Sequence, residues 1–89
     1  MDADLFGVIY WESNTNKMAA GGELGSEWHI RVENASPNAR QFIGRTLEVT
    51  PVPDIRNFQD RRVAMNAQIV QGGVSRRRPV VRIKGISLR

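Results

Sequence analysis

The chain has 89 residues with a net charge of +4; 40% are hydrophobic and 25% are charged, which suits one small domain spanning residues 1–89 and excludes general disorder. It contains no cysteine, so disulfides, thiolate nucleophiles and cysteine-ligated metal sites are excluded. Its apolar runs are far shorter than the roughly 20 residues of a membrane-spanning helix, and its acidic start lacks the features of a secretory signal, so we expect a cytoplasmic protein without a membrane partner.

Charge is divided unevenly along the chain. Residues 1–36 carry six acidic and two basic side chains, a net charge of −4, whereas residues 37–89 carry three acidic and eleven basic ones, a net charge of +8. Ten of those eleven are arginine, whose planar guanidinium forms bidentate contacts with phosphate or carboxylate. The asymmetry indicates an anionic partner or an attraction between the two halves; a general bias toward arginine is the plain alternative.

Five segments, taken in chain order, have the composition or the two-residue period of strands. A compact aromatic and branched run begins the chain, and the next two segments alternate cleanly between apolar and polar positions. The fourth segment, RVAMNAQIVQ, also suits a helix because methionine and alanine favour helices, but its alternation favours a strand. The predicted strands are residues 4–11, 27–33, 45–50, 62–70 and 79–88, around a core that includes Trp28, Ile30, Val32, Leu47, Val49, Ile69, Val81 and Ile83.

The last strand contains a change of phase. Val81 and Ile83 occupy odd positions, whereas Ile86 and Leu88 occupy even ones, and Gly85 lies at the join. One extra residue would return all four aliphatic side chains to the same face. We therefore predict a β-bulge at or next to Gly85, because bulges favour glycine, which adopts positive φ without steric cost.

These strands and the connections between them predict the fold class. Residues 12–26 are long for a hairpin connection, and residues 71–78 form the glycine-started tip of a last hairpin. We predict a mainly β domain, a small five-stranded barrel that is closed or partly open, OB-like or SH3-like, with one or two short helical turns. The alternative is a two-layer α+β sandwich, which would need a full helix at 37–43 or 53–62.

Enzyme chemistry finds little support. His29 is the only histidine, and the pattern places it on the polar side of a strand, where we interpret it as a solvated residue. No nucleophile-elbow motif accompanies it, and no cluster of metal-ligating residues occurs. The segment AGGELG lacks the spacing of a phosphate-binding glycine loop. We expect no catalytic activity, no metal and no cofactor.

Nucleic-acid binding is the sharper hypothesis, because basic residues gather at the last hairpin. We expect phosphate contact with little base stacking: the outward residues of the second and third strands are not aromatic, and Trp28 suits the core. Tyr10 and Trp11 are adjacent, so they point opposite ways and one of them is expected at the surface. The candidate nucleic-acid-binding residues are Arg76, Arg77, Arg78, Arg82, Lys84 and Arg89.

A protein-interaction module is the alternative. The acidic first part and the basic second part of the chain could pair between copies, and an exposed terminal strand could accept a partner strand. Such a chain would be an assembly or accessory protein, including a phage or mobile-element product, whose partner is another protein or a second copy of itself.

Overall fold

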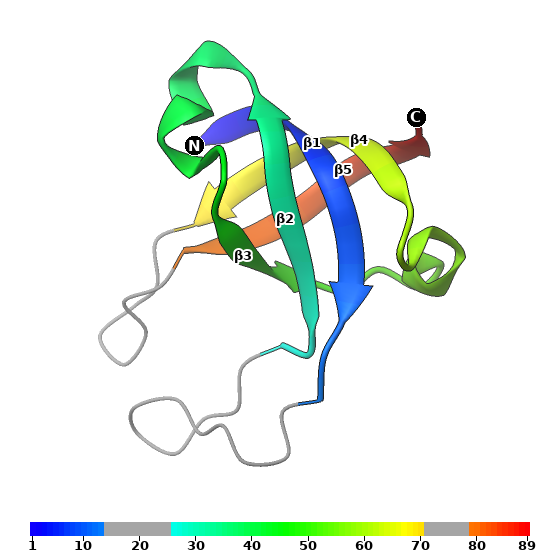
Figure 1. Cartoon of the computed structure of the whole chain (residues 1–89). Coiled ribbons are helices and arrows are strands. Elements are labelled where there is room, and N and C mark those ends of the chain that lie inside the picture. Colours follow the sequence, from blue (N-terminus) through cyan, green and yellow to red (C-terminus); the bar gives the residue numbers. More distant parts are fainter. Residues whose placement is uncertain (14–25, 71–78) are drawn as a thin grey trace, which may run out of the picture.

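The computed structural model describes residues 1–13, 26–70 and 79–89. It is mainly β, as the sequence predicts, and each predicted strand is present with ends that differ by at most two residues (Figure 1). The strands are β1 (Asp2–Trp11), β2 (Trp28–Ala35), β3 (Thr46–Thr50), β4 (Arg62–Val70) and β5 (Val80–Leu88).

The five strands form one sheet that closes into a ring in the order β1-β2-β3-β5-β4, with β4 paired to β1. Strands 4-1-2-3 are neighbours in the order of a Greek key, and β5 fills the remaining place between β3 and β4 (Figure 1). All described pairs are antiparallel except β3 with β5, which run parallel. Of the two predicted barrel types, OB-like and SH3-like, a five-stranded Greek-key barrel corresponds to the OB-like one.

The core fills the inside of this ring. Seven of the eight predicted core residues are buried, and Ile30, Val49 and Val81 are fully covered. Ile83 is only half-buried, although it still packs against the core. Leu88 lies opposite the buried Val63 and so is on the apolar face, as predicted, but it is 45% exposed because it is the last residue of β5, where the ring ends.

The predicted irregularity in β5 is present. The β4–β5 register passes from Asn66 opposite Gly85 to Ala67 opposite Ile83, so Lys84 is the extra residue. This shift lets both Ile83 and Ile86 pack against the core, as the phase change predicts. The bulge does not depend on a positive φ at Gly85, since among the described glycines only Gly44 has one.

A second bulge, between β1 and β2, depends on Gly7. The register shifts between Phe6 and Gly7, with Phe6 opposite Asn34 and Gly7 opposite Val32. A Cβ atom on Gly7 would lie 2.0 Å from the carbonyl oxygen of Arg31, closer than any side chain tolerates. Glycine is therefore required here by the close approach of two backbones rather than by its dihedral angles.

The connections contain two short 3₁₀ helices, η2 (Pro37–Phe42) and η3 (Ile55–Phe58). Ala39 and Phe42 of η2 and Ile55 of η3 are buried against the sheet. Neither is a full helix, since η2 is interrupted at Ala39 and η3 has only four residues, so the α+β sandwich is excluded. In the described part of the chain, no helix is long and apolar enough to cross a membrane.

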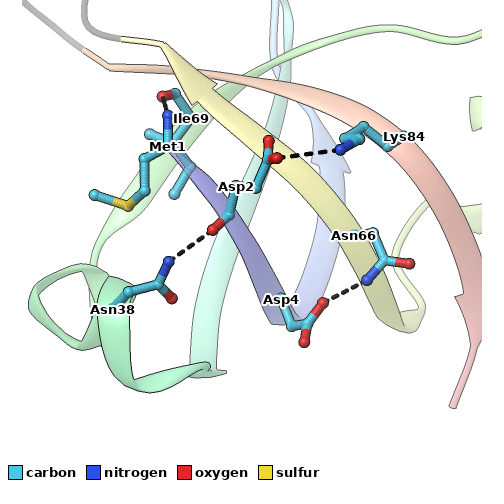
Figure 2. A network of polar contacts seen from close by, with 7 residues as sticks. All are labelled: Met1, Asp2, Asp4, Asn38, Asn66, Ile69 and Lys84. Atoms are coloured by element: carbon cyan, nitrogen blue, oxygen red, sulfur yellow. Dashed lines mark hydrogen bonds and ion pairs between the residues drawn. The ribbon is translucent and has the colours of Figure 1, made fainter.

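Polar contacts fasten the start of β1 to its neighbours (Figure 2). The ammonium group of Met1 donates to the carbonyl oxygen of Ile69 at 3.2 Å, and the side-chain amide of Asn38 donates to the carbonyl oxygen of Asp2 at 2.6 Å. These contacts join β1 to the end of β4 and to η2, and so hold one rim of the barrel together.

Candidate nucleic-acid interface

The predicted basic surface falls only partly within the described residues. The loop arginines, residues 76–78, lie outside them. Arg82 and Lys84 lie on β5, Arg89 directly follows it, and all three side chains are exposed. A continuous surface formed by all six residues therefore stays a prediction.

Lys84 already has a partner within the chain. Its Nζ lies 3.3 Å from a carboxylate oxygen of Asp2, and Figure 2 shows the lysine reaching across β4 toward β1. Beside this pair, the side-chain amide of Asn66 donates to the carboxylate of Asp4. Both members of the ion pair are exposed, so the pair is weak and a phosphate can compete for the lysine.

Arg82 and Arg89 lie toward opposite ends of β5. They are seven positions apart along the strand, which is on the order of 20 Å. The Arg89 guanidinium carbon lies 4.8 Å from the centroid of the Phe6 ring, a cation–π contact, and its backbone N–H donates to the carbonyl oxygen of Arg62 at 3.0 Å. Among the described members of the predicted site, Arg82 is the one nearest to the connection that carries the loop arginines.

One further arginine is held by an ion pair. Arg62 Nε donates to Glu33 Oε1 at 3.0 Å, joining β4 to the bulged end of β2. The hydrogen bond from Arg62 lowers the pKa of Glu33 and raises that of Arg62. Both side chains are exposed, Arg62 at 70% and Glu33 at 39%, so the pair fixes the two side chains more than it stabilises the fold.

The outward face of β1, β2 and β3 contains an aromatic pair. Tyr10 and His29 are register partners on β1 and β2, and His29 is opposite Glu48 on β3. The Tyr10 and His29 rings are stacked, with centroids 5.3 Å apart and planes 20° from parallel. Both side chains are half-buried, so each ring restricts the other. The interpretation of His29 as a simply solvated residue is therefore wrong.

His29 also has an unsatisfied nitrogen. Its Nδ1 is covered by protein atoms and has no hydrogen-bond partner. A covered polar atom without a partner costs free energy. The stacked Tyr10 ring, and not a hydrogen bond at Nδ1, is therefore the contact described on this side of the ring.

Two adjoining hollows lie beside this pair, and Tyr10 and Thr46 line both of them. The first has a volume of about 240 Å³ and the second about 340 Å³. We call them together the Tyr10 groove. The first hollow is also lined by Glu12, His29, Arg45, Leu47, Glu48 and Pro79, and the second by Val8, Arg31 and Asp60.

Each hollow contains one arginine. Arg45 lines the first, with its guanidinium carbon 5.5 Å from the centroid of the Phe42 ring, and Arg31 lines the second. Both side chains are exposed. Glu48 and Asp60 add negative charge, so the groove as a whole has mixed charge, with its cations at separate positions.

The outward residues of β2 and β3 are those that the sequence predicts, but the face extends onto β1, which adds an aromatic residue. The two-residue period of β1 places Tyr10 outward, in register with His29, and β1 borders β2 in the ring. Trp28 is buried as predicted, whereas Trp11 is 46% exposed at the end of β1. The outward alternation of Phe6, Val8 and Tyr10 was the signal for this extension of the face.

The described residues contain no group of three or more His, Cys, Asp or Glu side chains arranged to hold a metal ion. Comparisons of the chain with protein-family models, with curated proteins and with solved structures found no match.

Proposed function

We propose that this protein is a small nucleic-acid-binding module that uses the outward face of β1, β2 and β3 together with the basic last hairpin. The Tyr10 groove is the observation that carries the proposal, because it combines a stacked aromatic pair with two arginines on one face. In OB-like barrels, oligonucleotides bind across strands 2 and 3, between the β1–β2 and β4–β5 connections. Here those connections are residues 12–27 and 71–79, and the second contains Arg76, Arg77 and Arg78.

The charge of the chain supports the same function. Its net charge is +4 and its isoelectric point is about 10.7, with the excess of arginine in residues 37–89. Arginines that neutralise phosphates release counterions, which makes binding weaker as salt increases. We expect binding to single-stranded oligonucleotides that falls steeply between low and moderate salt.

The test is fluorescence anisotropy with labelled oligonucleotides over a series of salt concentrations. Replacing Arg76, Arg77 and Arg78 together with alanine should weaken binding to all sequences alike and flatten the salt slope by up to about three units. The control replaces Arg40 and Arg56, which lie in η2 and η3, and should change the slope much less. Absence of binding by the unmodified protein at low salt would refute the proposal.

A protein-interaction module is the second candidate, and one observation favours it. β5 pairs with β3 only over Val80–Arg82, so that edge of β5 from Ile83 onward has no partner among the described strands. Such an edge can accept a strand from another protein or another copy. The bulge at Lys84 and the charge of that residue are features that protect edges from this pairing, and for that reason we place this function second. A dimer mass in light scattering, lost on substitution within residues 83–88, would favour it.

A further inference from the structure

We infer that the Tyr10 groove takes one unpaired nucleobase, which stacks on the Tyr10–His29 pair, so that the protein selects single strands over duplexes. This inference rests on the proposed function and names the chemistry of its site. It replaces an expectation of phosphate contact alone with a specific contact to a base.

The aromatic pair has the properties of a stacking platform. Its rings are nearly parallel, at 20°, and both come from paired strands, so their backbones are fixed. Each ring already restricts the other, which reduces the rotamer entropy that a ligand must remove on binding. Aromatic surfaces of this kind bind any base through its π face.

The surroundings of the pair favour a single base over a duplex. The hollows are about 240 and 340 Å³, close to the lower limit for small-molecule sites. A base within a duplex has both faces covered by its neighbours, so it cannot present one to Tyr10 without leaving the stack. An unpaired base can do so at little cost.

The polar groups of the groove suit the rest of a nucleotide. Arg45 lines one hollow and Arg31 the other, so a phosphate on each side of a bound base would have a guanidinium partner. Thr46, which lines both hollows, adds an exposed hydroxyl.

The experiment compares two variants at one position. Tyr10→Ala removes the ring, and Tyr10→Phe keeps it while removing only the hydroxyl. We expect Tyr10→Ala to lower the affinity for a single-stranded thymidine oligomer by roughly 5- to 150-fold, and Tyr10→Phe to bind within about 3-fold of the unmodified protein. The salt slope should stay the same in both variants, because neither removes a charge.

A second measurement needs no variant and keeps the inference testable if Tyr10→Ala does not fold. The unmodified protein is titrated with an oligomer of abasic sites that keeps every phosphate, and with a duplex of the same length. Weaker binding of both than of the thymidine oligomer supports the inference. Equal binding of the abasic and thymidine oligomers would overturn the base contact and leave the proposed function standing, whereas no binding of any oligomer would overturn both.

Discussion

Replacing Gly7 with alanine should be among the most destabilising single-methyl additions in this protein. The new Cβ would lie 2.0 Å from the carbonyl oxygen of Arg31, 2.9 Å from its carbonyl carbon and 3.2 Å from the Cα of Val32. All three are backbone atoms of β2, so β2 must move by about 1 Å, because contacts under 3.0 Å do not occur. Overpacking costs about 1–3 kcal/mol and each lost ladder hydrogen bond about 1 kcal/mol, which gives about 2–5 kcal/mol in total.

Urea denaturation followed by circular dichroism measures this loss as a change in midpoint at constant slope. Gly85→Ala is the matched control, since its Cβ would meet only the side-chain oxygen of Asn66, at 3.7 Å. We expect the control to stay within about 1 kcal/mol of the unmodified protein. If Gly7→Ala has the same stability as the unmodified protein, or if Gly85→Ala costs as much, then the close approach of β1 and β2 does not determine the need for glycine.

Three further outcomes are expected. Asp60 has a φ of 61°, so Asp60→Gly should leave the urea midpoint nearly unchanged while Asp60→Val lowers the free energy of unfolding by about 1–3 kcal/mol. Ile30→Ala should cost about 2–5 kcal/mol in the same assay and Ile83→Ala clearly less, because Ile30 is fully buried and Ile83 only half-buried. Arg62 lowers the folded-state pKa of Glu33, so the ion pair stabilises the fold only while Glu33 is ionised. In thermal melts, Glu33→Gln should therefore be less stable than the unmodified protein above the ordinary pKa of 4.5, and the difference should disappear as the pH falls through the lowered value.

The strands were predictable because their apolar positions face one interior. The two-residue period gave every strand to within one or two residues, and the phase change around Gly85 indicated the bulge that lets Ile83 and Ile86 share the core. Because one face of each strand is buried, the apolar pattern of that strand alone indicates which of its residues face the core. The period alone could not give the exposure of Leu88, which depends on where the ring ends.

The groove was harder to predict because it depends on which strands are neighbours. Tyr10 and His29 are 19 positions apart in the sequence, and only the β1–β2 register brings their rings together. The requirement for glycine at position 7 also depends on which strands are neighbours, because the atom that a Cβ would meet is the carbonyl oxygen of Arg31 on β2. A glycine inside a strand pattern was the available signal for a bulge or a close backbone approach. The ion pair of Lys84 with Asp2 likewise crosses a whole strand.

The most direct test of nucleic-acid binding by the Tyr10 groove is a two-dimensional amide NMR titration of the unmodified protein with a short thymidine oligomer at low salt. We predict that the largest shift changes occur at Tyr10, His29, Arg31, Arg45 and Thr46, and that they decrease as salt is added. An unchanged spectrum, or shifts confined to the edge of β5 at residues 83–88, would contradict the account.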